Sequence, residues 1–191
     1  ASKYFKKVDF PALTQAQQSE GHFKWGYSYF NQKQLTPALE QFNFVKKQSN
    51  AWSPAANYYA GFIEYSEGLY DEALVDLKKA ETNASYASIV PYLIANVYYK
   101  QKKYDELLSY TASLKNKTGL QNAREISMLS AEAHYFKGDY EKAAQAYEAF
   151  LEENPGSAEG SLLFRAGYSN YSLNRTDKAV AYLCKSAATK D

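Results

Sequence analysis

Two stretches of the chain share one pattern: residues 95–107 read ANVYYKQKKYDEL, and residues 131–143 read AEAHYFKGDYEKA. Each stretch begins with alanine and has tyrosine four positions later. Each then continues through a polar, turn-like segment to a second small or medium-sized apolar residue. The two stretches lie 36 residues apart. A shared pattern at this spacing is typical of proteins built from stacked repeats, so it predicts further copies elsewhere in the chain.

The pattern recurs along the chain with a period of 34 to 36 residues. In each copy a small residue is followed twelve positions later by a second anchor, which is alanine in four of the five copies. Apolar residues on both sides of the intervening turn have helical spacing, so each copy predicts two helices joined by a short turn. Small anchors let the two helix backbones approach closely. The first anchors are Gly26, Gly61, Ala95, Ala131 and Gly167, and the second anchors are Ala38, Ala73, Leu107, Ala143 and Ala179.

These residues resemble the tetratricopeptide repeat, a helical hairpin of 34 residues with small anchors, aromatic residues and a closing proline. The resemblance implies an all-α fold, a right-handed superhelix (α-solenoid) of about five helix–turn–helix repeats plus a partial N-terminal repeat. The third copy departs most from the pattern, with Leu107 for alanine and Thr111 for an aromatic residue, so we expect its hairpin to be splayed or shifted. The fourth copy fits best, at Ala131, Tyr140, Ala143, Tyr147, Phe150 and Pro155.

The repeat boundaries follow from the anchors. Residues 1–18 are predicted to be a tail and linker, because Ala1, Phe5 and Val8 are spaced like apolar residues on the second helix of a preceding repeat. The sequence begins without methionine and ends without a polar capping helix, which predicts a fragment of a longer protein. The array itself is predicted over residues 19–191, with repeats near 19–53, 54–87, 88–123, 124–159 and 160–191.

In the family that the chain resembles, the first helices of successive hairpins line an inner groove. Three positions on each first helix, four and three residues apart, share one helix face. In this chain these positions are mostly aromatic, and they account for many of the 19 tyrosines. The sequence therefore predicts an aromatic partner-binding groove, while any single ring can instead fill a contact between neighbouring first helices. The predicted groove residues are Phe23, Tyr27, Phe30, Tyr58, Phe62, Tyr65, Tyr92, Asn96, Tyr99, Lys100, Met128, Glu132, Tyr135, Phe164, Tyr168 and Tyr171.

Rigid amphipathic rings suit an extended peptide or a helix of another protein, so the leading prediction is a scaffold for protein–protein interaction. Asn96, Lys100 and Glu132 interrupt the rings, where they either fix the register of a ligand or form a solvated patch. Phe23, Tyr27 and Tyr59 stand where some family members carry a clamp for a terminal carboxylate, which disfavours that mode. Two alternatives stay open: an architectural spacer or oligomerisation module whose groove is filled by the parent chain, and a glycan-binding surface.

The sequence shows no catalytic, metal or cofactor motif, so we expect no enzyme activity, no cofactor and no metal site. His22 and His134 are far apart, and His134 is predicted to be a hydrogen-bonded structural histidine. The single cysteine, Cys184, excludes an intrachain disulfide and is predicted to pack among apolar neighbours. The 22 basic and 21 acidic residues nearly cancel, which argues against nucleic acid as a partner. No apolar run is long enough to cross a bilayer.

Residues 146–179, AYEAFLEENPGSAEGSLLFRAGYSNYSLNRTDKA, look like repeats of bacterial envelope proteins. These include outer-membrane assembly lipoproteins and a cell-division coordinator of the envelope-constricting system. The resemblance implies a periplasmic or cell-envelope location. The junction that carries it also occurs in cytoplasmic arrays, so a cytoplasmic location remains the alternative. The partner and the oligomeric state are left open by the sequence.

Overall fold

The computed structural model describes residues 2–154 and 159–189. Over these residues the chain forms eleven α-helices, one short 3-10 helix and no strand, so the predicted all-α class is confirmed. Two residues used by the sequence pattern, Ala1 and Pro155, lie outside the described residues. The chain divides into two compact units, residues 1–97 and 98–191.

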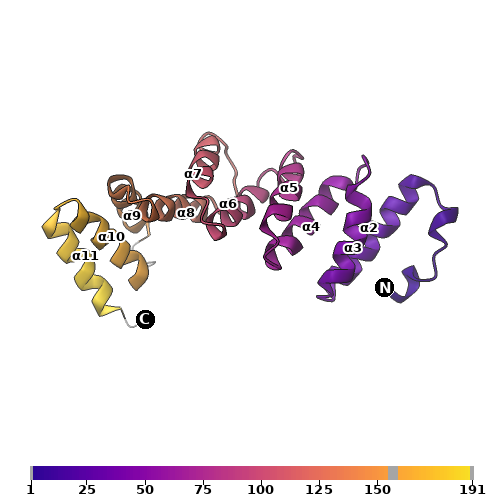
Figure 1. Ribbon diagram of the computed structural model, residues 1–191, viewed down its shortest axis with the longest axis horizontal. Helices are drawn as coiled ribbons and strands as arrows, with labels where there is room; N and C mark the ends of the chain where they lie inside the picture. Colours follow the sequence, from indigo (N-terminus) through magenta and orange to yellow (C-terminus); the bar gives the residue numbers. More distant parts are fainter. Residues whose placement is uncertain (1, 155–158, 190–191) are drawn as a thin grey trace. The chain divides into compact units, whose positions relative to one another are not determined.

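Five helical hairpins follow one another along the chain (Figure 1). Each joins its two helices through a turn of only three residues, so the two helices run antiparallel. The third hairpin has the shortest helices, of 11 and 10 residues. The pairs are α2 (Gln15–Asn31) with α3 (Leu35–Lys46), α4 (Ser53–Ser66) with α5 (Tyr70–Glu81), α6 (Val90–Lys100) with α7 (Tyr104–Ser113), α8 (Ala123–Phe136) with α9 (Tyr140–Glu153), and α10 (Gly160–Ser172) with α11 (Thr176–Ala188).

All five hairpins turn in the same way. The second residue after each first helix has a left-handed backbone, with φ between 56° and 79°. The N–H of the following residue donates to the carbonyl five residues back, which ends the first helix. The carbonyl of that same residue accepts from the N–H of the second anchor, which starts the second helix. These hydrogen bonds fix the spacing between the two anchors, and the third hairpin has them too. The left-handed residues are Lys33, Gly68, Lys102, Gly138 and Asn174.

The anchors lie where the two helices of a hairpin approach each other. A Cβ atom added to Gly61 would lie 2.8 Å from Cγ of Leu77, and one added to Gly167 would lie 2.8 Å from Cγ of Leu183. The five second anchors are all buried. The repeated small residues therefore mark close helix contacts, as their spacing predicted.

In unit 1, α3 packs against both α2 and α4, and α4 packs against α5. The core between these helices is formed by large side chains, among them Phe42, Val45 and Ile63, together with small alanines that let the helices come close. Helix α3 thus covers both its own first helix, α2, and the first helix of the next hairpin, α4.

Two short helices, α1 (Ser2–Phe5) and η1 (Phe10–Ala12), precede the first hairpin. The last residue of α1 and the first residue of η1 stack on the ring of Trp25, with ring centroids 6.2 and 5.7 Å apart. Helix α1 ends before Val8, which is exposed, so the helical face predicted for residues 1–10 is not continuous. Helix α2 begins at Gln15, inside the segment assigned to the linker.

In unit 2, α8 packs against α7 and α9, and α10 packs against α9 and α11. Tyr147, Leu151, Leu162 and Leu163 form most of the core between α8, α9 and α10. The prediction for Cys184 is wrong, because this side chain is exposed. Helix α11 packs on α10 around Gly167, and among the described residues nothing covers the face on which the cysteine lies.

Candidate functional site

The aromatic residues among the predicted groove residues of α8 and α10 lie in one connected group of rings in unit 2. Tyr168 is at its centre: its ring centroid lies 5.9 Å from that of Tyr135, 5.7 Å from Tyr140, 6.1 Å from Phe164 and 6.4 Å from Tyr171. Phe164, Tyr168 and Tyr171 are all exposed. Rings that contact one another and still face solvent form a continuous apolar surface with hydroxyl groups along it.

Phe136 extends this surface and was not predicted. Its ring centroid lies 5.5 Å from those of Tyr135 and Tyr104 and 6.4 Å from that of Tyr99, and its side chain is exposed. It follows the first anchor by five positions, whereas the sequence stripe used the position four after the anchor. The phenylalanine that directly follows the stripe position Tyr135 was the signal available in the sequence. The unit 2 aromatic surface therefore consists of Tyr99, Tyr104, Tyr135, Phe136, Tyr140, Phe164, Tyr168 and Tyr171.

Glu132 is buried, although the sequence placed it in the groove as a ligand-facing residue. Its Oε1 accepts from Nη1 of Arg165 at 2.6 Å and from the hydroxyl of Tyr147 at 3.0 Å, and its Oε2 accepts from the hydroxyl of Tyr99 at 3.3 Å. Burial, followed by the Glu132 carboxylate, raises the pKa of both Tyr99 and Tyr147, so their hydroxyls stay protonated and act as donors. Protein groups thus occupy both carboxylate oxygens.

Arg165 connects this buried carboxylate to the unit 2 aromatic surface. Its Cζ lies 5.7 Å from the ring centroid of Phe136, and its side chain is partly exposed. A guanidinium over an aromatic face is attracted by the ring, and Glu132 holds its other side. A shallow pocket opens beside it, lined by Tyr135, Phe136, Gly160, Ser161, Phe164, Arg165, Ser186 and Thr189.

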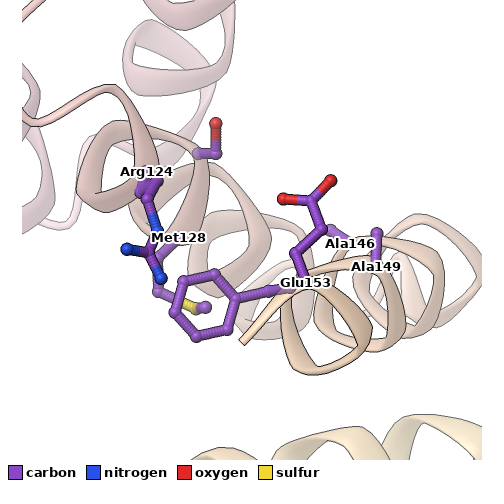
Figure 2. A pocket seen from close by; sticks show the side chains of 7 residues that line it. Arg124, Met128, Ala146, Ala149 and Glu153 are labelled. Carbon is purple, nitrogen blue, oxygen red and sulfur yellow. The ribbon is translucent and has the colours of Figure 1, made fainter. Parts of the chain in front are cut away.

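Two predicted groove residues of unit 2 lie apart from these rings. Lys100 is exposed at the end of α6. Met128 lines a different pocket, between α8 and α9, together with Arg124 and Phe150 (Figure 2). The structure therefore does not gather all the predicted residues of unit 2 into one site.

In unit 1 the stripes of α2 and α4 are connected through Tyr59, which the sequence stripe also missed. Its ring centroid lies 5.4 Å from that of Tyr27, 5.1 Å from Phe30 and 5.1 Å from Tyr58. Burial, followed by the neighbouring Tyr27, raises the pKa of Tyr59 to about 12. Tyr59 and Arg165 both stand two positions before their first anchor, so this position carries the contacts to the preceding first helix in both units.

The rings of unit 1 are mostly packed against one another. Only Tyr27 among the predicted residues there is exposed. Asn96 donates from Nδ2 to the carbonyl oxygen of Tyr92 in its own helix, at 2.8 Å. In this unit the rings therefore fill contacts between first helices more than they face solvent. The half-buried residues are Phe23, Phe30, Tyr58, Phe62, Tyr65, Tyr92 and Asn96.

His134 is half-buried, and its Nδ1 lies 3.2 Å from Oδ2 of Asp139 but has no hydrogen-bond partner within the described residues. Burial lowers the pKa of His134 despite this carboxylate, so the ring is neutral at pH 7. Over the described residues, no three His, Cys, Asp or Glu side chains come together as a metal site. None of the helices in that part of the chain combines the length and apolar character needed to span a bilayer.

A sequence model of the tetratricopeptide repeat matches residues 92–158 and residues 128–191, which together make up more than half of the chain. The chain belongs to the tetratricopeptide-repeat family. Tetratricopeptide arrays are solenoids whose stacked helices form extended binding surfaces for other proteins, and members of the family are typically not enzymes. The family resemblance stated from the sequence is thereby confirmed.

Solved tetratricopeptide structures have a similar fold. YrrB, described as a TPR protein with an unusual peptide-binding site, is 19% identical and has a TM-score of 0.73, over 97% of this chain and 92% of its own. MamA, from residue 41 to its end, from Desulfovibrio magneticus RS-1, is 15% identical with a TM-score of 0.71, over 92% of this chain and 96% of its own. A further MamA structure is 16% identical with a TM-score of 0.72, over 88% of this chain and 89% of its own. No curated protein matches the chain in sequence.

Proposed function

We propose that the protein is a scaffold that binds an extended peptide or a helix of a partner protein on the unit 2 aromatic surface. The observation that carries the proposal is the set of exposed, mutually contacting rings on α8 and α10, centred on Tyr168. Exposed apolar patches of this kind are typical of interaction sites. Tyrosine and phenylalanine also supply large contact areas while losing little side-chain entropy on binding.

Arg165 adds polar recognition to this apolar surface. Of its donors, Nη1 is engaged by Glu132, and the guanidinium lies over Phe136 at the edge of the pocket. Aromatic residues and arginine are the residue types most often found at the energetic centres of protein interfaces. A peptide carbonyl beside an apolar side chain fits this combination. The peptide-binding site named for YrrB supports the same type of ligand.

The choice of residues for a test follows from exposure. Tyr65, Tyr99 and Tyr135 are half-buried, and their truncation would weaken packing as well as binding. Phe164 and Tyr171 are 47% and 66% exposed, so replacing them by serine should leave the fold intact.

The experiment selects peptides from a phage-displayed library on the purified chain and measures their affinity by fluorescence anisotropy. Phe164→Ser with Tyr171→Ser should weaken binding at least tenfold, because central aromatic contacts contribute about 2 kcal/mol or more each. The matched control is Val75→Ser with Val180→Ser, two second-helix residues that are 54% and 55% exposed. Equal affinity of the two double variants would remove the unit 2 aromatic surface as the binding site.

The alternatives predict other results with the same variants. An oligomerisation module would select no peptide, and its mass in solution would rise with concentration unless Phe164 and Tyr171 were replaced. A glycan-binding surface would show changes in tyrosine fluorescence with peptidoglycan fragments and none with peptides. Either result would replace the peptide proposal.

We also propose a location in the bacterial cell envelope. Its support is the resemblance of residues 146–179 to repeats of envelope proteins. Fractionation of cells that express the full reading frame tests it. Recovery in the periplasmic or membrane fraction is expected, and recovery with cytoplasmic markers would favour the alternative location.

A further inference from the structure

A second pocket lies between α8 and α9, outside the unit 2 aromatic surface, and has a volume of about 230 Å³ (Figure 2). Arg124 and Met128 extend into it from α8, and Ala146, Ala149 and Glu153 line it from α9. These positions recur every three or four residues on each helix, so one face of each helix forms one wall. Ser127 and Phe150 complete the lining.

The pocket exists because small residues stand where the other repeats carry larger ones. Ala146 follows the first anchor of its repeat by fifteen positions. In the first repeat the equivalent glutamine accepts, through its Oε1, a hydrogen bond of 2.7 Å from Nδ1 of His22 and so fills the space between the two helices. No other repeat has alanine at this position. The equivalent residues are Gln41, Asp76, Tyr110 and Tyr182, and those equivalent to Ala149 are Phe44, Lys79, Ser113 and Lys185.

Two opposite charges border the pocket without pairing. Within the described residues, the side chains of Arg124 and Glu153 form no ion pair or hydrogen bond, either with each other or with a third residue. The guanidinium of Arg124 lies instead over the ring of Phe150, 5.7 Å from its centroid. Phe150 therefore holds the guanidinium of Arg124 at the opening of the pocket. The N–H groups of Arg124 remain available to a ligand.

Both charges also lie at helix ends that disfavour them. Arg124 is in the first turn of α8, where the helix dipole repels a cation, and Glu153 is the last residue of α9, where it repels an anion. Neither position therefore stabilises the hairpin electrostatically. A ligand that offers an acceptor to Arg124 and a donor to Glu153 would satisfy both groups.

We propose that this pocket binds one medium-sized apolar side chain, such as leucine, of a peptide segment of the partner protein. The carbonyl oxygen of that residue accepts from Arg124, and an adjacent backbone N–H donates to Glu153. The alanines, Met128 and Phe150 surround the side chain. An apolar cavity of about 150 Å³ holds a benzene-sized group, so 230 Å³ is sufficient. A neutral peptide group matches a mouth whose two charges cancel.

The chain offers a direct reporter, because Met128 is its only methionine. Labelling with [13C-methyl]methionine therefore gives a single NMR signal from inside the pocket. The probe is N-acetyl-leucinamide, which has the apolar side chain, the carbonyl and the N–H. Its titration should shift the Met128 signal saturably with a dissociation constant in the millimolar range. N-acetylglycinamide, which lacks the side chain, should not.

Variants assign the contacts. Ala146→Gln, which introduces the residue of the first repeat, should fill the pocket and abolish saturable binding, while Ala149→Ser should preserve it. Arg124→Gln and Glu153→Gln, at exposed positions that keep the fold, should each weaken binding at least threefold. Binding of N-acetylglycinamide equal to that of the leucine probe, or no saturable shift at all, would overturn the proposal. Tighter binding of free leucine would show that the pocket recognises a zwitterion instead.

The identity of the ligand as a partner segment rests on the proposed function, but the two can fail separately. If selected peptides bind and Ala146→Gln leaves their affinity unchanged, the pocket proposal fails and the scaffold function stands. If N-acetyl-leucinamide binds but no peptide is selected, the scaffold function fails and the pocket remains a site for a capped apolar residue.

Discussion

Arg165 of α10 donates from Nη1 to Oε1 of the buried Glu132 of α8 at 2.6 Å, across the interface between the fourth and fifth hairpins. Glu132 also accepts from Tyr147, so it holds three helices together. Glu132→Gln keeps the size of the side chain but removes its charge. We expect a loss of about 2 kcal/mol in the free energy of unfolding, as for a hydrogen bond to a charged group. Urea unfolding, followed by spectroscopic signals from residues of unit 2, measures this loss.

The double variant Glu132→Gln with Arg165→Gln is the control for this pair. It should be less destabilised than the sum of the two single variants, since each single change leaves one charge without its partner. Full additivity would show that the pair is not coupled. If Glu132→Gln were as stable as the wild type but no longer bound peptide, Glu132 would contact the ligand, as the sequence predicted.

Lys46 of α3 forms ion pairs with two buried carboxylates, Glu64 of α4 at 3.2 Å and Asp76 of α5. Burial, followed by Asp76, raises the pKa of Glu64. A carboxyl whose folded-state pKa is raised contributes stability below its unfolded pKa of 4.5, and this contribution is lost as the pH rises through the folded-state pKa. Glu64→Gln should therefore stabilise the protein at pH 7.5, and its advantage should shrink toward pH 4.5.

Thermal unfolding of Glu64→Gln and the wild type across this pH range measures the difference. Lys46→Met provides the opposite case, because it leaves two buried carboxylates without a cation. Its expected loss at pH 7.5 is about 3 to 5 kcal/mol, with partial recovery at low pH. A constant difference between Glu64→Gln and the wild type at every pH would show that Glu64 does not titrate in this range.

The repeat period was predictable from the sequence because it reflects contacts inside one hairpin. Gly61 and Gly167 recur at fixed spacing since a Cβ there would meet Leu77 or Leu183 on the paired helix. The left-handed turn residue is likewise local, and its effect extends over only a few residues. Such constraints repeat in every copy, so one sequence contains five examples of the same pattern.

The contacts between hairpins were not predictable in the same way. Glu132 occupies the repeat position of Tyr27 and Tyr168, which are exposed, yet it is buried because Arg165 follows 33 residues later. A partner of this kind occurs in one copy only. Met128 is a similar case, because its pocket depends on the small residues Ala146 and Ala149 on the neighbouring helix. Side-chain combinations that occur in one copy only cannot be predicted from a repeat period. They contribute Arg165 and the pocket beside Met128, whereas the period did predict the rings of Tyr135, Phe164, Tyr168 and Tyr171.

The left-handed turn residues give a prediction about stability. Lys33 has φ of 57°, a conformation that costs an L-residue about 1 kcal/mol and glycine almost nothing. Lys33→Gly should therefore raise the free energy of unfolding by about 1 kcal/mol, and Gly68→Ala should lower it by a similar amount. A Cβ at Gly68 has open space around it, so the expected loss comes only from the strained left-handed backbone of alanine.

Gln34→Gly is the matched control for the turn, because this neighbouring residue has φ of −90° and gains nothing from glycine. It should be neutral or destabilised. Chemical denaturation of the three variants tests the set, and a loss of stability in Lys33→Gly would contradict the turn argument.

The anchor glycines give the last prediction. Gly61→Ala places a methyl group 2.8 Å from Cγ of the buried Leu77 and 3.2 Å from its backbone nitrogen, so the helices of the second hairpin must separate. Overpacking of this size costs about 1 to 3 kcal/mol. The third repeat combines alanine at the anchor with Thr111 opposite it, so Gly61→Ala with Leu77→Thr should lose less than the sum of the single variants. Urea unfolding of the two single variants and the double variant measures these losses. A Gly61→Ala variant as stable as the wild type would show that these helices can move apart freely.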